Sequence, residues 1–327
     1  MPSEPSSIRI AVLALDGCVA SSVTGPLDVF AMANLLSRDG GKGAPFSAEL
    51  VSVRTGPTRI FHGLELAAVR AVEPTDRFDV ILIPAVVGSL DACLAEPATS
   101  AWLKGQHDQG AKLAAVCAGA FLLAQTGLLD GREATTHWGL ARDFAARYPR
   151  VALKPELLLL DHGDVLTAGG ITACLDLCLH LVAKHASPEL ASHCAKMLLV
   201  EPGRRFQVPY AVHSAPREHG DAAVLRAQEW LEAHLASEVS LSGAAAAASL
   251  GARTLLRRFQ KATGVTPLEY VQRLRIEAAR RLLETTPRTV EDISQAVGYV
   301  DTTSFRRRFK ARTGLSPDAY RRRFALR

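Results

Sequence analysis

The amino-acid sequence predicts an α/β domain with a doubly wound, mostly parallel sheet, followed by an all-α domain with two helix-turn-helix units. Short apolar runs alternate with helical patterns over the first two thirds of the chain, and the pattern after residue 221 is helical throughout. A motif of fourteen residues near the C-terminus also occurs twice, fifty residues apart. The 327 residues suffice for two domains that each bury a core.

Apolar runs rich in β-branched residues predict buried parallel strands in the first domain. These runs lie at residues 8–15, 46–54, 79–85, 112–116 and 165–168. Helical patterns lie at residues 26–36, 99–109, 118–129, 171–184 and 188–200. Because strands and helices alternate, the helices are expected to connect parallel strands and to cover the sheet.

A polar segment, interrupted by Pro and Gly over residues 202–221, separates the two domains. We expect it to pack back on the first domain, residues 1–210, and then to form a linker over residues 211–221. The second domain is expected over residues 222–327. Its helices are predicted at residues 222–235, 240–248, 252–263, 267–285, 289–297, 302–313 and 317–324.

Basic charge is concentrated in the second domain. Residues 221–327 hold 19 of the 38 Lys and Arg residues but 11 of the 33 Asp and Glu residues, a net charge of +8, whereas residues 1–220 have a net charge of −3. Of those 19 basic residues 17 are Arg, the side chain suited to bidentate contacts with phosphate and guanine. A solvated basic face is the alternative explanation.

The sequence predicts a cytoplasmic protein without a membrane span, metal or cofactor. It shows no signal-peptide pattern, and no apolar run reaches about 18 residues. The six cysteines lie scattered in apolar segments, as expected for reduced thiols. Cys174 and Cys178 are four residues apart, with His180 nearby, but a metal site would need further ligands, so an apolar core helix is expected.

The repeated motif predicts one supersecondary unit built twice. Residues 257–270 and 307–320 agree at seven of fourteen positions, and each copy joins a basic helix to a Gly stop and a new helix start at Thr-Pro or Ser-Pro. In a helix-turn-helix, the second helix enters the major groove of DNA. The side chains expected to face double-stranded DNA are Arg253, Leu256, Arg257, Arg258, Thr302, Thr303, Arg306 and Arg307.

Residues 238–324 resemble the DNA-binding domain of the AraC/XylS family. The matching segments are RRFQKATGVTPLEYVQRLRIEAARRLLETT, VEDISQAVGY and SFRRRFKARTGLSPDAY. The chain departs from the family pattern in the alanine run 244–248 and at Ser294, where the family has a small Ala. Both changes are compatible with helices, since Ala favours helix and Ser is close to Ala in size.

In the first domain, Cys117 lies where a predicted strand stops and a helix starts. The small residues Ala118 and Gly119 follow it, which permits a sharp turn. The helix N-terminus is expected to lower the pKa of the thiol. His137 follows twenty residues later and offers an imidazole partner for that thiol.

Residues 8–200 resemble the class I glutamine-amidotransferase-like, or ThiJ/PfpI, domain, which implies a flavodoxin-like sheet. The matching segments are LALDGCVASSVTGPLDVF, AAVCAGAFLLAQTGLLDGREATTHW and TAGGITACLDLCLHLV. Enzymes of this superfamily use the elbow Cys as nucleophile with a His and a carboxylate from the first strand–helix loop. Here the resemblance places Ser22 at the position of the acid, and Asp16 lies too early in the loop to replace it.

Together, the two resemblances imply a transcriptional regulator of the amidase-type AraC subgroup, not an enzyme. The effector site is expected at Cys117, Ala118, Gly119, His137 and Trp138, for a small, nitrogen-containing molecule whose cation would face the indole. A homodimer is also expected. Cys117 could instead be a plain buried thiol. For the whole chain, one alternative is a Cys-dependent hydrolase or amidotransferase-like enzyme fused to a DNA-binding module, and another is a purely architectural DNA-binding protein, which would not need a pocketed α/β domain.

Overall fold

The computed structural model describes residues 7–66, 70–73, 75–88, 90–212, 217–237 and 239–325. The chain divides into two compact units, Met1–Gln207 and Val208–Arg327.

The first unit contains a seven-stranded sheet in the order β10-β11-β7-β6-β1-β2-β5. The strands that run parallel at its centre are β1 (Ile8–Leu13), β2 (Phe46–Ser52), β6 (Val80–Ile83), β7 (Lys112–Val116) and β11 (Val165–Ala168). At the edges, β5 (Arg70–Ala71) is parallel to β2, and β10 (Leu159–Asp161) is antiparallel to β11. Two short ladders pair β3 (Thr58–Arg59) with β4 (Glu65–Leu66), and β8 (Glu133–Ala134) with β9 (Ala152–Leu153).

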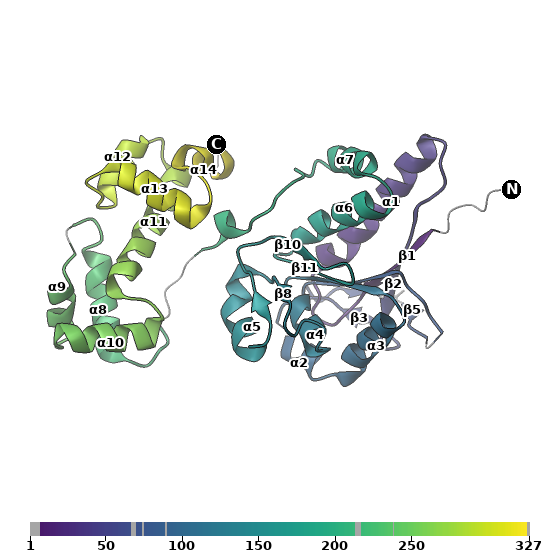
Figure 1. Ribbon diagram of the computed structural model, residues 1–327, viewed down its shortest axis with the longest axis horizontal. Coiled ribbons are helices and arrows are strands. Elements are labelled where there is room, and N and C mark those ends of the chain that lie inside the picture. Colours follow the sequence, from purple (N-terminus) through teal and green to yellow (C-terminus); the bar gives the residue numbers. More distant parts are fainter. Residues whose placement is uncertain are drawn as a thin grey trace. The chain divides into compact units, whose positions relative to one another are not determined.

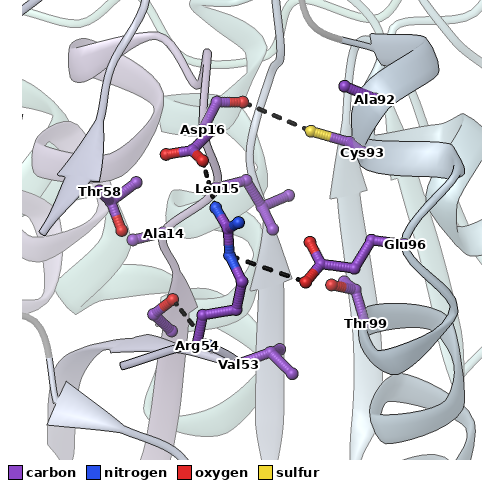
Figure 2. Close-up of a pocket in the computed structure, with 11 residues that line it drawn as sticks. Ala14, Leu15, Asp16, Val53, Arg54, Thr58, Ala92, Cys93, Glu96 and Thr99 are labelled. Carbon is purple, nitrogen blue, oxygen red and sulfur yellow. Dashed lines mark hydrogen bonds and ion pairs between the residues drawn. The ribbon is translucent and has the colours of Figure 1, made fainter. Parts of the chain in front are cut away.

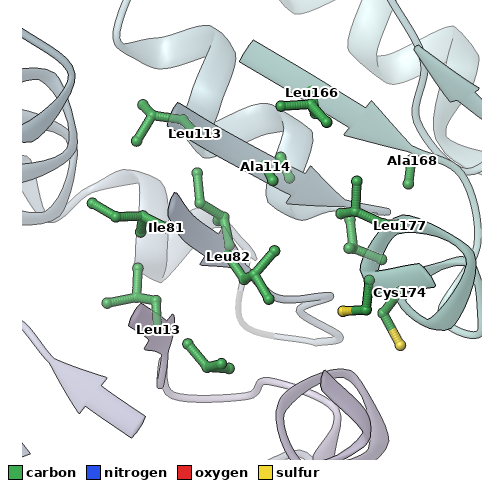
Figure 3. Close-up of a cluster of buried hydrophobic side chains, with 14 of the residues drawn as sticks. Leu13, Ile81, Leu82, Leu113, Ala114, Leu166, Ala168, Cys174 and Leu177 are labelled. Atoms are coloured by element: carbon green, nitrogen blue, oxygen red, sulfur yellow. The ribbon is translucent and has the colours of Figure 1, made fainter. Parts of the chain in front are cut away.

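Helices cover both faces of this sheet. Figure 1 shows α1 (Ala20–Asp39), α6 (Ala173–His185) and α7 (Pro188–Met197) on one face. The other face carries α2 (Leu90–Leu94), α3 (Pro97–Asp108) and α4 (Gly119–Gln125), and α5 (Ala141–Arg147) follows a single 3-10 turn at Trp138–Leu140. Figure 3 shows Leu82 and Ala114 from the strands near Cys174 and Leu177 of α6, all buried. The prediction of a doubly wound, mostly parallel α/β domain is confirmed.

The first helix begins earlier than the sequence suggested. It starts at Ala20, whereas the apolar pattern predicted a start at Pro26, and the proline lies inside it. The preceding residue is Gly25, which has no Cβ for the proline ring to crowd, and this weakens the usual bias against helix before proline. At the other end of the domain, α4 stops at Gln125 and the chain turns at Gly127, whose φ is +80°, so the helix predicted to run to residue 129 is shorter.

The second unit is helical, as predicted. Its helices are α8 (Ala222–Ala233), α9 (Leu241–Ala247), α10 (Ala252–Thr263), α11 (Pro267–Thr285), α12 (Val290–Ala296), α13 (Thr302–Thr313) and α14 (Pro317–Phe324). One hydrophobic cluster contains Leu255, Phe259 and Tyr270, and a second contains Phe305 and Phe309. The long helix α11 contributes side chains to both clusters, so it joins the two helix-turn-helix halves.

The segment predicted as a linker, 211–221, falls within the second unit. Ala211 is buried just after a 3-10 turn at Val208–Tyr210, and Asp221 caps the N-terminus of α8. His219 also contacts Gln228 of α8, with 2.8 Å between Nε2 and Oε1. Residues 213–216 of the predicted linker lie outside the described residues.

Candidate nucleic-acid interface and elbow site

The two helix-turn-helix units support their second helices with the same aromatic contact. In the first unit, the rings of Phe259 and Tyr270 meet edge to face, with centroids 5.3 Å apart and planes at 83°. In the second, Phe309 and Tyr320 lie 5.4 Å apart at 84°. Each Phe is fully buried, so it fixes which face of its helix points away from the core.

The turn after each second helix is also repeated in atomic detail. The Thr263 hydroxyl donates to the carbonyl of Phe259 at 2.7 Å, and Gly264 follows with φ +76°. The Thr313 hydroxyl donates to the carbonyl of Phe309 at 2.9 Å, and Gly314 follows with φ +75°. This left-handed conformation is strained for residues with a Cβ, which explains why both copies of the motif carry Gly.

Most of the side chains predicted to face DNA lie on the exposed faces of α10 and α13. Arg253, Arg257, Thr303 and Arg307 are exposed, Thr302 is half-buried, and Leu256 is 37% exposed. Within the described residues, the guanidinium groups of Arg253, Arg257 and Arg307 form no hydrogen bond or ion pair. These cations are therefore available to an external anion.

Two of the predicted DNA-facing arginines are instead held by carboxylates of the protein. Arg258 donates to both carboxylate oxygens of Asp221, at 2.9 and 2.7 Å, and so ties α10 to the start of α8. Arg306 lies between Glu291 at 3.0 Å and Asp318 at 2.8 Å. Sequence spacing gave no signal for the first pair, because its partners are 37 residues apart.

In the first unit, Cys117 forms a sharp elbow between β7 and α4. Its φ is +55°, which is rare for a residue other than Gly. Its amide donates to the carbonyl of Ala168 at 2.9 Å, and its carbonyl accepts from the Thr136 hydroxyl at 2.7 Å. A Cβ on Gly119 would lie 2.6 Å from the carbonyl oxygen of Pro84, so glycine is required for this close approach.

The thiol at this elbow is not activated. The sequence predicted that the helix N-terminus would lower its pKa, but burial raises the pKa of Cys117 to about 11, against a smaller lowering by the Ala118 amide. That prediction is wrong for a physical reason. Cys117 is 6% exposed as a whole residue, and desolvation of the thiolate outweighs the short helix behind it.

His137, the predicted partner of Cys117, is oriented by a backbone amide two residues further along the chain. The Nδ1 atom of His137 accepts the amide of Gly139 at 3.1 Å, and its ring lies 4.9 Å from that of Trp138. Burial lowers the pKa of His137, which favours the neutral imidazole. Among the described residues, no hydrogen bond joins His137 to Cys117.

The residues near the expected acid position are also engaged elsewhere. Ser22 lies inside α1, where its buried hydroxyl donates to the carbonyl of Val19 at 2.7 Å and accepts the amide of Ala85 at 3.2 Å. The Asp16 carboxylate pairs with Arg54 and accepts the amide of Arg59 at 3.0 Å. Among the described residues, neither side chain forms a hydrogen bond with Cys117.

Sequence reasoning missed two hollows in the first unit. One is a cavity of about 80 Å³ lined by Arg54, Asp16, Glu96 and Cys93. Figure 2 shows Arg54 reaching towards Asp16 and Glu96, with the Cys93 thiol near Asp16. That volume accommodates a few atoms only. A larger groove, of about 630 Å³, lies between α6, α7, β10 and the segment 202–206. Its walls come from segments 157–206, so only the fold brings them together.

The described residues contain neither a cluster of potential metal ligands nor a helix that could span a membrane. Cys174 and Cys178 are buried in α6, and the described residues contain no group of three potential metal ligands. Among the helices of the described chain, none is long and apolar enough to cross a membrane.

Both domains of the molecule match known protein families. Residues 8–184 match the DJ-1/PfpI family, and residues 244–323 match a helix-turn-helix domain of the AraC type. The HTH-type transcriptional regulator Rv1931c of Mycobacterium tuberculosis is 30% identical over 269 residues, which cover 77% of this chain and 98% of that protein. The chain belongs to the AraC-type transcriptional regulators with a DJ-1/PfpI domain.

Other members of this family match along almost the whole chain. The HTH-type transcriptional regulator GbdR of Pseudomonas aeruginosa is 27% identical over 320 residues, 97% of this chain and 84% of that protein. DJ-1beta of Drosophila melanogaster has a TM-score of 0.51 at 18% identity, covering 60% of this chain and all of that one, and it supports the fold alone. Both resemblances identified from the sequence are therefore confirmed, as is the assignment as a transcriptional regulator.

Proposed function

We propose that this regulator binds double-stranded DNA through the exposed faces of α10 and α13. The observation that carries the proposal is the pair Arg257 and Arg307, which occupy the same place on two matching frameworks and have no partner among the described residues. Bidentate Arg contacts to guanine are the commonest specific contacts in the major groove. The proposed contact residues are Arg253, Leu256 and Arg257 from α10, and Thr302, Thr303 and Arg307 from α13. Arg258 and Arg306 contribute less, because carboxylates already hold them.

The length of α11 supports contact with two segments of one duplex. Its 19 residues span about 28 Å, close to one turn of B-form DNA. Two recognition helices joined by such a spacer suit successive major grooves on one side of the duplex.

The test is binding of the full-length protein to promoter-upstream duplexes over a range of salt concentrations. Affinity is expected to fall steeply with salt, because arginines release condensed counterions when they neutralise phosphates. Arg257→Ala and Arg307→Ala weaken binding, whereas Arg142→Ala, on α5 of the first unit, is the matched control and leaves it unchanged. Binding that does not depend on salt would contradict the proposal.

We also propose that the DJ-1/PfpI domain senses a small, nitrogen-containing molecule beside the elbow. His137 and Trp138 supply the half-buried aromatic surface, and Cys117, Ala118 and Gly119 supply the buried wall behind it. The effector would bind two domain arrangements with different affinity and thereby change DNA binding. The regulator would act in the cytoplasm as a homodimer.

We further propose that this domain has no catalytic activity. The protonated state of Cys117, the Nδ1 of His137 occupied by the Gly139 amide and the engaged hydroxyl of Ser22 all argue against a nucleophile with its base and acid. One observation favours the rival enzyme: the strained elbow conformation of Cys117 resembles that of a presented nucleophile.

Reactivity of Cys117 separates these two functions. Its alkylation by iodoacetamide, followed by mass spectrometry of the peptide that contains it, is expected to accelerate with pH up to about 11, the pKa of the thiol, because only the thiolate reacts. Cys117→Ser is expected to leave folding and DNA binding intact. Turnover of a small amide, ester or carbonyl substrate by the wild type that disappears in Cys117→Ser would instead establish the enzyme.

A further inference from the structure

The groove of about 630 Å³ in the first unit is the size of a small-molecule site. Its walls are mostly apolar and come from α6, α7, β10 and the segment 202–206. The side chains that form the apolar surface include Leu157, Leu159, Leu179, Ala183, Ala191 and Phe206. None of the residues assigned to the elbow lines this groove.

The wall formed by residues 204–206 is held in place by hydrogen bonds. Leu157 and Phe206 form an antiparallel bridge, and the amide of Leu158 donates to the carbonyl of Arg205 at 2.9 Å. Arg204 is clamped to α6 through Asp176, with 3.1 Å between Nε and Oδ1. The groove is therefore a built surface and not a gap beside a loose segment.

The charges around this groove select for one kind of ligand. Asp176 is paired with Arg204, and Asp161 accepts from His180 and from Lys184, each at 2.7 Å. Both carboxylates are thus neutralised. Arg205, in contrast, is exposed on the groove wall and has no ion-pair partner within the described residues. We propose that the groove binds a small amphipathic carboxylate, with its apolar chain between α6 and α7 and its carboxylate on Arg205.

Binding here would reach the DNA-binding unit, an inference that rests on the function proposed above. The wall continues into Gln207, whose buried amide group donates to the carbonyl of Thr136 at 2.7 Å within the first unit. The next residues belong to the second unit, where buried Arg280 of α11 donates to the carbonyl of Pro209 at 2.6 Å and also to that of Ala211. A ligand bound against residues 204–206 therefore contacts a chain segment that continues directly into residues held by the helix-turn-helix unit.

Octanoate is the probe for the site, and octylammonium is its charge-reversed control. Calorimetric titration of the full-length protein is expected to show saturable octanoate binding with a raised melting temperature, and no octylammonium binding. Arg205→Glu weakens octanoate binding at least about tenfold, because a charge-assisted contact becomes a repulsion. Arg38→Glu, an exposed position on α1 outside the groove, leaves binding unchanged.

A second variant tests the apolar part of the site. Ala191→Trp fills the groove from α7 and is expected to abolish octanoate binding while the elbow residues stay untouched. Absence of octanoate binding, or equal binding to the wild type, Arg205→Glu and Ala191→Trp, overturns the proposal. A melting temperature without ligand, measured for each variant, separates loss of the site from loss of the fold.

Promoter DNA affinity with and without saturating octanoate tests the regulatory part separately. It is expected to change in the wild type and to stay constant in Gln207→Met, which keeps the side-chain volume but loses the hydrogen bonds to Thr135, Thr136, Leu157 and Trp138. Octanoate binding without any change in DNA affinity overturns the coupling and leaves the site intact. Failure to bind DNA under all conditions counts against the proposed function, not against the groove.

Discussion

Where the second helix-turn-helix unit carries an ion pair, the first carries two exposed leucines. Arg306 and Asp318 lie 2.8 Å apart in the second unit, and the residues fifty positions earlier are Leu256 and Leu268, which are 37% and 65% exposed. The buried framework, in contrast, is nearly the same in both units, down to the ring geometry around Phe259 and Phe309. The two copies therefore share the framework that holds the second helix and differ on the face proposed to contact DNA.

Given the proposed function, this difference predicts that the two units recognise different base pairs. An exposed Leu suits the methyl group of thymine, whereas an Arg that is held by two carboxylates is restrained from bases. Elsewhere on the same faces, Arg253 of the first unit corresponds to Thr303 of the second. Among the described residues of these two faces, Arg257 and Arg307 are the one matched pair of cations without an ion-pair partner.

The largest expected effect tests the equality of the two frameworks. Phe259→Ala and Phe309→Ala should each destabilise the protein by about 3–5 kcal/mol, because each removes a fully buried ring and leaves a cavity beside a tyrosine. Chemical denaturation followed by circular dichroism measures both. Losses that differ by more than about 2 kcal/mol would show that the frameworks are not equivalent.

A smaller loss of stability is expected from substituting the glycine in the turn after each second helix. Gly264→Ala and Gly314→Ala should each cost about 1 kcal/mol, because both glycines have positive φ while a Cβ would meet no other atom within 4 Å. Thermal unfolding of the two variants provides the comparison. If only one of the two variants kept the wild-type stability, the turn in that unit would be able to relax around a Cβ. The two turns would then not be equivalent.

The smallest expected effect is on the salt dependence of DNA binding, and it tests the difference between the exposed faces of α10 and α13. Leu256→Arg introduces a cation whose neighbour at position 268 is Leu, so the arginine stays unpaired and should steepen the salt dependence of binding to random DNA by about one phosphate contact. The reverse exchange, Arg306→Leu, should change this slope little, because Glu291 and Asp318 already neutralise that arginine. If Leu256→Arg and Arg306→Leu changed the slope by equal and opposite amounts, the claim that the carboxylates keep Arg306 from DNA would be wrong.

Local signals in the sequence were sufficient for the helical domain. The bounds of α10, α11, α13 and α14 match the predicted ranges, because each pair is separated by a Gly stop and a Thr-Pro or Ser-Pro start. For α11 the start is fixed by the Thr266 hydroxyl, which accepts the amide of Glu269 at 3.2 Å. The sequence of the first domain likewise predicted β7 and β11 to the residue, because both are short apolar runs with clear ends.

The candidate sites depended on contacts that no local pattern contains. Arg258 meets Asp221, and Arg306 meets Glu291, only after the helices pack. The elbow residue Cys117 was correctly placed between strand and helix, but its pKa depends on how completely the surrounding fold removes water. The groove beside Arg205 depends in the same way on segments that are distant in sequence.

The most direct test of the account is the base preference of each unit. Duplexes selected from a random library by the full-length wild type, by Arg257→Ala and by Arg307→Ala are sequenced and compared. Each variant is expected to lose preference at its own base position, with the two positions about 10 base pairs apart, and to lose about 1–3 kcal/mol on the wild-type site. Loss of preference at the same position in both variants, or an equal loss of affinity on selected and random DNA, would contradict the claim that two preserved frameworks recognise two different segments of one duplex.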